Sequence, residues 1–92
     1  MPYRVEFTPA AERDLRKLAK GNRDIARRIA EAVAKLKDDT RPNGVKKLTG
    51  TSDTIYRIVV GTYRVLYTID DGELLIIVIR IAHRSEVYAR PA

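Results

Sequence analysis

Apolar residues follow a strand period near the beginning and in the second half of the chain, and a helical period between them. Residues 3–7 alternate apolar with charged side chains, as in a half-buried β-strand. From Val45 onward the strand period returns and predicts three longer strands. They span residues 54–60, 63–69 and 73–82, with Gly61-Thr62 and Asp70-Asp71-Gly72 between them.

Two helices are predicted between these strand regions. Thr8 supplies a hydroxyl N-cap and Pro9 the first helical position, and the helix ends near Gly21. Asn22 can cap a second helix that runs to about Lys37. Two amphipathic helices joined by so short a break predict an αα-hairpin that covers one face of the sheet.

A two-residue loop at Gly61-Thr62 would fix which side chains share a face. The expected cross-strand pairs are Val60–Tyr63, Val59–Arg64 and Arg57–Leu66. One face is wholly apolar or aromatic and should pack under the helices: Tyr56, Ile58, Val60, Tyr63, Val65 and Tyr67. The opposite face, called the arginine face below, carries Ile55, Arg57, Val59, Arg64, Leu66 and Thr68.

The second turn leaves two registers open. A three-residue turn with Gly72 in the left-handed conformation places Arg80 on the arginine face and Ile77 and Ile79 under the helices. A two-residue Asp71-Gly72 turn buries Arg80 instead. Because an unpaired buried guanidinium is costly, the sequence favours the first register.

The length of 92 residues and the order of the elements predict one α+β domain over residues 1–92: an N-terminal strand and an αα-hairpin packed on one face of a small, mainly antiparallel, twisted sheet. Apolar residues make up 45% of the chain, so a formal net charge of +6 does not indicate disorder. Cysteine is absent from the sequence, which excludes disulfides and thiolate zinc sites. No secretory signal and no apolar run approaching the roughly 20 residues of a membrane span occurs, so a cytoplasmic protein is expected.

Positive charge is concentrated between Arg41 and Thr68. The cations there are Arg41, Lys46, Lys47, Arg57 and Arg64, and Asp53 is the single anion, which gives 5 − 1 = +4. After the last strand come His83, Arg84 and Tyr88, the side-chain types that transfer protons, bind phosphate or stack on a base. RNA suits such a set because its own 2′-OH can act as nucleophile, without a metal or a covalent intermediate.

Each of these residues also has a purely structural interpretation. Arg57 and Arg64 would be solubilising on a solvated sheet face. His83 would be structural or exposed, and Tyr88 would be a hydrophobic plug near the chain end. The sequence has no acidic cluster that suggests a divalent metal and no glycine-rich phosphate loop.

Five short segments occur in an informative order and spacing. They are VEFTPAA at 5–11, LTG at 48–50, YRI at 56–58, GTYRVLY at 61–67 and HRSEVY at 83–88. Together they resemble the RelE/ParE toxin superfamily over nearly the whole chain. The resemblance implies the toxin of a type II toxin–antitoxin pair, and in its RelE branch an endoribonuclease that cuts mRNA in the ribosomal A site by the 2′-OH route.

The resemblance also implies roles for single residues. Arg57 is the basic residue of the central sheet, and Arg64 would hold the scissile phosphate. Arg84 would stabilise the leaving group or transition state, and Tyr88 would orient or stack on the substrate. The basic positions expected to contact RNA or the ribosome are Arg41, Lys46 and Lys47.

One position departs from the RelE pattern. RelE carries a second lysine two residues beyond the first on the same strand, and Val59 occupies that site here. His83 could replace it as the proton-transfer group, since its ordinary pKa of about 6.5 suits acid or base work near neutrality. No cofactor or metal is expected.

The expected partners are the ribosome, its mRNA and a cognate antitoxin. The antitoxin should be an acidic, partly disordered chain that covers the basic face. Membrane binding is not expected, and DNA would be reached only through the antitoxin. Two other functions stay open: a ParE-like inhibitor of DNA gyrase, which shares the fold but lacks the nuclease residues, and an RNA-binding protein without catalysis.

Overall fold

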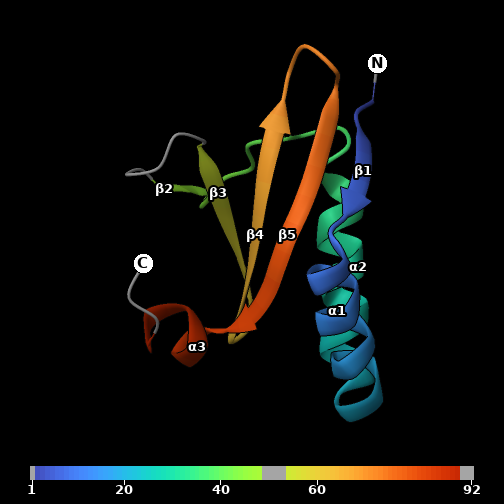
Figure 1. Ribbon diagram of the computed structural model, residues 1–92, viewed down its shortest axis with the longest axis vertical. Coiled ribbons are helices and arrows are strands. Elements are labelled where there is room, and N and C mark those ends of the chain that lie inside the picture. The colour runs from blue at the N-terminus through green and yellow to red at the C-terminus, as the bar shows by residue number, and fades with distance from the viewer. Residues whose placement is uncertain (1, 49–53, 90–92) are drawn as a thin grey trace.

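The computed structural model describes residues 2–48 and 54–89, the last three of these by their backbone alone. Five strands form one sheet in the order β1-β5-β4-β3-β2. Only the β1–β5 pair is parallel. Figure 1 shows α1 and α2 together on one side of this sheet and α3 near its opposite side. The elements are β1 (Arg4–Phe7), α1 (Pro9–Gly21), α2 (Arg23–Lys35), β2 (Lys46–Leu48), β3 (Ile55–Val60), β4 (Tyr63–Asp70), β5 (Leu75–His83) and α3 (Arg84–Ala89).

The two long helices begin where their capping residues predict. The Thr8 hydroxyl accepts the Ala11 N–H at 3.1 Å, and Pro9 opens α1. The Asn22 side chain accepts the Ile25 N–H at 3.3 Å and begins α2. These contacts satisfy amide groups that have no partner inside the helix. The predicted strand–hairpin–sheet architecture is therefore confirmed, although α2 ends at Lys35 rather than near Lys37.

The core lies between the helical hairpin and one face of the sheet. From the helices it takes Ile29, Val33 and Leu36, all 4% exposed or less. From the sheet it takes Ile58, Val60, Val65, Tyr67, Ile76, Val78 and Ile81. The β3–β4 register has Val60 opposite Tyr63, Val59 opposite Arg64 and Arg57 opposite Leu66, as predicted. Gly61 begins the turn at φ +60°, where a Cβ would come 3.1 Å from Ile25 Cδ1, so both conformation and space favour glycine.

The β4–β5 hairpin differs from the prediction. Its turn is four residues long, and Leu74, not Gly72, adopts the left-handed conformation at φ 53°. Because of this turn, Ile77 pairs with Thr68 of the arginine face and is not under the helices. A bulge then shifts the register between Leu66 and Tyr67. Ile79 is only half buried, and the core positions of β5 are instead Ile76, Val78 and Ile81.

Arg80 keeps its predicted backbone face but not its predicted side-chain position. Its backbone is opposite Leu66, as expected for the arginine face. Its guanidinium nevertheless bonds Asp14 of α1, so the predicted place of this side chain is wrong. The physical reason is that the long arginine side chain reaches around the outer edge of β5 to the helical layer.

Two short elements had no separate prediction. The three-residue strand β2 pairs with β3 at the edge of the sheet. The six-residue helix α3 follows β5 directly and contacts β4 and β5. No helix in the described part of the chain is long and apolar enough to cross a bilayer.

Candidate nuclease site

The two arginines of the candidate site share the sheet face that points away from α1 and α2. Strand alternation puts Ile58 and Val65 into the helix-covered core, and therefore puts Arg57 and Arg64 on the other side. Arg57 is opposite Leu66 and Arg64 is opposite Val59, so the two arginines are diagonal neighbours on adjacent strands. Diagonal neighbours lie roughly 7–8 Å apart, within reach of one phosphodiester for side chains of this length.

Arg57 is much less accessible than a solubilising residue would be. It is 9% exposed, while Val59 on the same strand and face is 50% exposed. Removing a guanidinium from water is expensive, and a residue that only improves solubility gains nothing from it. The structure therefore argues against the solubilising interpretation of Arg57.

Arg64 is half buried and incompletely hydrogen-bonded. One terminal nitrogen donates to the Tyr63 carbonyl at 3.3 Å. Its Nε is buried without a hydrogen-bond partner. A guanidinium presents several N–H groups in a rigid fork, so this side chain retains donors for a planar anion such as phosphate. This is the property expected of a phosphate-binding arginine.

His83 lies at the end of β5, opposite Tyr63. The two rings pack edge to face with centroids 5.4 Å apart. Tyr63 also lines a hollow of about 510 Å³ together with Gly21 and Asn22, which places it toward the helical hairpin. His83 therefore lies with Tyr63 on the helix-facing side of the sheet end, and not on the arginine face.

His83 also caps α3. Its Nδ1 accepts the Ser85 N–H at 3.2 Å and is 2.9 Å from the Ser85 hydroxyl. In return, the Glu86 carboxylate accepts the His83 N–H at 3.3 Å. This is a capping box with an imidazole in place of the usual hydroxyl. With Nδ1 accepting, we assign the proton of the neutral ring to Nε2, which is the nitrogen left for a substrate.

Arg84 is exposed at the first position of α3, and its backbone N–H bonds the Thr62 carbonyl at 2.8 Å. That bond fixes the start of α3 to the β3–β4 turn, close to Arg64. Tyr88 belongs to the same helix, but its side chain lies outside the described part of the structure. In Figure 1, α3 lies on the side of the sheet away from α1 and α2, as the site requires.

The predicted RNA-contacting residues separate into two groups. Lys46 and Lys47 are exposed on the edge strand β2. Lys46 is directly opposite Arg57 and extends the basic surface, whereas Lys47 is opposite Tyr56 and belongs to the other face of the sheet. Arg41 does not join the arginine face either. It pairs with Asp71 at 3.1 Å and lies over the Tyr56 ring at 5.3 Å, at the helix-covered face.

Arg41 instead belongs to a clamp formed by Tyr3, Arg41 and Asp71, which joins three segments of the chain. Asp71 also accepts a hydrogen bond from the Tyr3 hydroxyl, and these two bonds lower the pKa of the Asp71 carboxyl. Tyr56 stacks on Tyr67 with centroids 5.8 Å apart. The structure thus gives Arg41 a structural partner that the sequence alone did not reveal.

The Asp14–Arg80 ion pair at the outer edge of β5 was also not predicted from the sequence. Asp14 of α1 accepts the Arg80 Nε at 2.8 Å and the Ile81 N–H at 2.9 Å. The hydrogen bond and charge of Asp14 raise the pKa of Arg80. The two residues are 66 positions apart, so no local pattern in the sequence could have indicated the pair.

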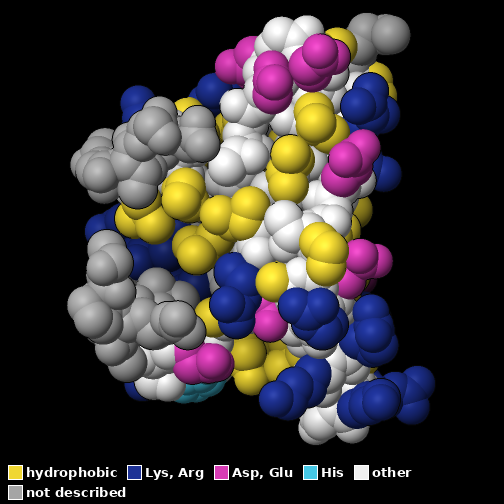
Figure 2. Space-filling model, in the orientation of Figure 1, with side chains coloured by type: hydrophobic (Ala, Val, Ile, Leu, Met, Phe, Trp, Pro, Cys, Tyr) yellow, Lys and Arg dark blue, Asp and Glu magenta, His cyan; other side chains and the backbone are white. Residues whose placement is uncertain are grey.

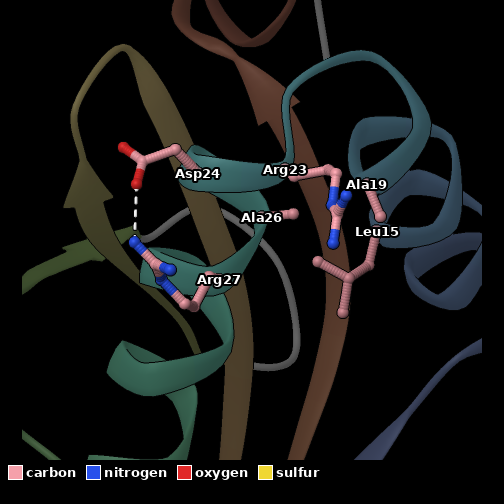
Figure 3. Close-up of a pocket in the computed structure, with 6 residues that line it drawn as sticks. All are labelled: Leu15, Ala19, Arg23, Asp24, Ala26 and Arg27. Atoms are coloured by element: carbon pink, nitrogen blue, oxygen red, sulfur yellow. Dashed lines mark hydrogen bonds and ion pairs between the residues drawn. The ribbon is translucent and has the colours of Figure 1, made fainter.

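A further hollow of about 680 Å³ lies between α1 and α2 and takes no residue from the sheet. Figure 3 shows Arg23 beside Leu15 and Ala19, with the Asp24–Arg27 ion pair on the other side of Ala26. The Asp24 and Arg27 side chains are 2.8 Å apart. Its lining residues are Leu15, Ala19, Arg23, Asp24, Ala26 and Arg27. In Figure 2, Lys and Arg side chains gather over this lower part of the hairpin. Because the hollow is formed by the helical layer alone, it is separate from the arginine face.

Metal-ligating residues do not cluster. Within residues 2–48 and 54–89, no group of three or more His, Asp or Glu side chains is arranged to hold an ion. The cation-rich face described above offers donors to an anion and no carboxylate set for a divalent metal.

Comparison with known proteins identifies the family of this chain. The family model described as "ParE toxin of type II toxin-antitoxin system, parDE" matches residues 5–88. Toxin RelG of Mycobacterium tuberculosis is 37% identical over 93 residues, covering 98% of this chain and 100% of RelG. Toxin RelE of the same organism is 36% identical over 88 residues, covering 95% of this chain and 87% of that protein.

Solved structures agree in fold. The archaeal RelE–RelB complex from Pyrococcus horikoshii contains a chain with TM-score 0.75 and 31% identity, covering 91% of this chain and 97% of that one. A mutant of the E. coli toxin RelE in the free state gives TM-score 0.74 and 26% identity, covering 97% and 93%. The family model, these relatives and the shared fold identify a toxin of a type II toxin–antitoxin system. Within that class, this chain belongs to the RelE/ParE family and is RelE-like.

Proposed function

We propose that this toxin is a ribosome-dependent mRNA endonuclease that inhibits translation in the cytoplasm. One observation carries the proposal: a guanidinium that is only 9% exposed is diagonal to a second, incompletely bonded one, on the face away from the helices. Such a pair offers convergent N–H donors to a phosphodiester. Electrostatic stabilisation of the charge that develops at phosphorus is then the main task left to the protein.

The proposed reaction uses the RNA's own 2′-OH. The 2′-OH loses its proton to solvent water as the 2′-oxygen bonds to the adjacent phosphorus. The P–O5′ bond breaks, the 5′-oxygen takes up a proton, and the products are a 2′,3′-cyclic phosphate and a 5′-OH. Arg64 binds the non-bridging oxygens, and Arg57 and Arg84 stabilise the additional charge in the transition state. Tyr88 orients the substrate.

His83 supplies a proton to the leaving 5′-oxygen in this scheme. It does so from Nε2 in the doubly protonated state, because Nδ1 faces Ser85. The Ser85 hydroxyl can reverse its role and accept from Nδ1–H, so the imidazolium keeps one partner. The Ser85 backbone N–H, which can only donate, loses its acceptor in that state, so proton transfer at this position competes with the cap of α3.

The proposed partner that silences the toxin is an acidic, partly disordered antitoxin. Several structural relatives are described as complexes of RelE with RelB, from Pyrococcus horikoshii and Methanococcus jannaschii among others. Charge complementarity supports a segment laid over Lys46, Lys47 and the arginine face. Contact with DNA would come through that antitoxin.

A gyrase inhibitor is the second candidate. The matching family model is that of the ParE toxins, and Val59 stands where RelE has a lysine. Gyrase inhibition would need no phosphate-binding pair, whereas the nuclease depends on it.

Parallel assays separate the two functions. The toxin and its Arg64→Met variant are induced in a bacterium, transcript ends are mapped, and plasmid supercoiling is measured. We expect cuts within translated codons that Arg64→Met abolishes. The matched control is Arg4→Met on the far edge strand, which should cut like the wild type. Altered DNA topology with intact mRNA would instead establish gyrase inhibition, and normal growth with neither effect would reject both.

A further inference from the structure

Asp14 lies at the place where β5 loses its outer neighbour. Strand β1 accompanies β5 only as far as the Phe7–Val78 pair. The backbone of Thr8 then donates to the Val78 carbonyl at 3.0 Å, and its hydroxyl donates to the Ile79 carbonyl at 2.9 Å. Beyond this point the chain turns into α1, and the outer edge of β5 has no strand beside it.

The Asp14 carboxylate takes the place of that missing strand. It accepts the Ile81 N–H at 2.9 Å, which is the next free donor along the edge. The same carboxylate oxygen receives the Arg80 Nε at 2.8 Å, and the second oxygen is 3.4 Å from an Arg80 terminal nitrogen. The Asp14 side chain is 19% exposed, so this three-bond contact is partly shielded from water. Charge-assisted bonds of this kind are stronger than neutral ones.

The length of the Arg80 side chain makes this contact possible. After the register shift beside Leu66–Tyr67, Arg80 is opposite Leu66, and its guanidinium reaches around the outer edge of β5 to Asp14. The strand remains paired with β4 on its inner side through Ala82 and His83. The last residues of β5 are thus fixed from both sides, by β4 within the sheet and by Asp14 of the helical layer.

We infer that Asp14, with Arg80, is a positioning device for the tail that carries His83 and Arg84. Ile81 is two residues before His83 and three before Arg84, too few for independent motion of a strand. If the edge bond is lost, the tail shifts relative to Arg64, which belongs to β4. The inference rests on the proposed nuclease function, since it assigns Asp14 a part in that site without contact to the substrate.

Three variants test the inference in the full chain. Asp14→Ala removes the carboxylate and improves intrinsic helix propensity, so a loss cannot come from a weaker α1. Asp14→Asn retains an oxygen that can accept the Ile81 N–H but loses the charge. The matched control is Asp24→Ala, which removes an exposed Asp–Arg pair from α2.

The first measurement is cleavage of mRNA on programmed ribosomes, resolved into kcat and KM. Displacement of a catalytic group by about 1 Å can cost on the order of 100-fold in rate. We expect Asp14→Ala to lower kcat roughly 10- to 100-fold with KM within about threefold of wild type. Asp14→Asn should recover most of that loss, and Asp24→Ala should leave both constants unchanged. Wild-type kcat in Asp14→Ala, or a loss confined to KM, would overturn the inference.

The second measurement does not depend on activity. In Asp14→Ala, amide hydrogen exchange of the free toxin should become at least about tenfold faster at Ile81 and Arg84. Exchange of the β4 amides should be nearly unchanged, because local opening exposes only the released segment. Uniform acceleration throughout the sheet would show a general stabilising contact and reject the positioning role. Should the wild type not cut mRNA at all, the proposed function fails, and exchange alone decides whether Asp14 fixes the tail.

Discussion

Replacement of Arg64 by methionine should make the toxin more stable and inactive. The buried Nε of Arg64 has no hydrogen-bond partner, and an orphaned buried donor costs about 1–3 kcal/mol. Methionine has similar length and no polar group, so it removes this penalty and keeps the stem's contacts. After allowance for the lost bond to the Tyr63 carbonyl, worth about 1 kcal/mol, we expect a net gain of up to about 2 kcal/mol.

Thermal unfolding followed by circular dichroism measures the gain. For a domain of this size, 1 kcal/mol corresponds to a rise of about 4–8 °C in Tm. Cleavage on programmed ribosomes should fall by a factor of about 100–1,000, as when one donor to a developing oxyanion is removed. Arg4→Met, with its 3.9 Å surface pair, should change neither quantity measurably. If Arg64→Met unfolds more easily than the wild type, or cuts RNA as fast, Arg64 is not a phosphate ligand that carries an unpaired buried Nε.

Three further changes test other parts of the structure. Val59→Lys introduces a cation at a 50% exposed position opposite Arg64, so mRNA cleavage should increase at least severalfold. The free energy of unfolding should change by less than about 0.5 kcal/mol. Unchanged cleavage would show that the site does not use this position. Tyr67→Phe leaves the Thr40 carbonyl without its 2.8 Å donor, and urea unfolding should show a loss of about 1–2 kcal/mol. Asp71→Asn should lower the urea midpoint at neutral pH, because the pKa of Asp71 is lowered by Tyr3 and Arg41 and its charged form stabilises the fold above the ordinary carboxyl range. That difference from wild type should disappear as the pH falls below about 4, and a constant difference would contradict the charged clamp.

The parts of the fold that could be predicted from the sequence depend on interactions between residues close together in the chain. Thr8 and Asn22 cap helices through atoms within three residues, and Gly61 fixes a tight hairpin. Each of these signals is complete within one short segment. The pleat then sorts Arg57 and Arg64 onto one face without further information.

The features that could not be predicted depend on contacts between distant segments. The bulge in β5 compensates for a four-residue turn, and Leu74 accepts the left-handed conformation that Gly72 was expected to take. Partners for Arg41 and Arg80 come from 30 and 66 residues away. The pleat indicates the face of a side chain, but it does not indicate whether a long cation stays on that face or reaches around an edge.

The double role of His83 determines how its part in catalysis can be tested. Alanine at this position would remove the imidazole and also the acceptor of the Ser85 N–H, which caps α3. Loss of a cap costs about 1 kcal/mol and would disturb Arg84 and the backbone of Tyr88, so reduced cleavage in His83→Ala would not identify a proton donor. Asparagine is among the best N-cap residues and does not titrate near neutrality, so His83→Asn separates the two roles. If His83 donates the proton, His83→Asn should lose cleavage as fully as His83→Ala does. If the cap is all that matters, His83→Asn should cleave like the wild type.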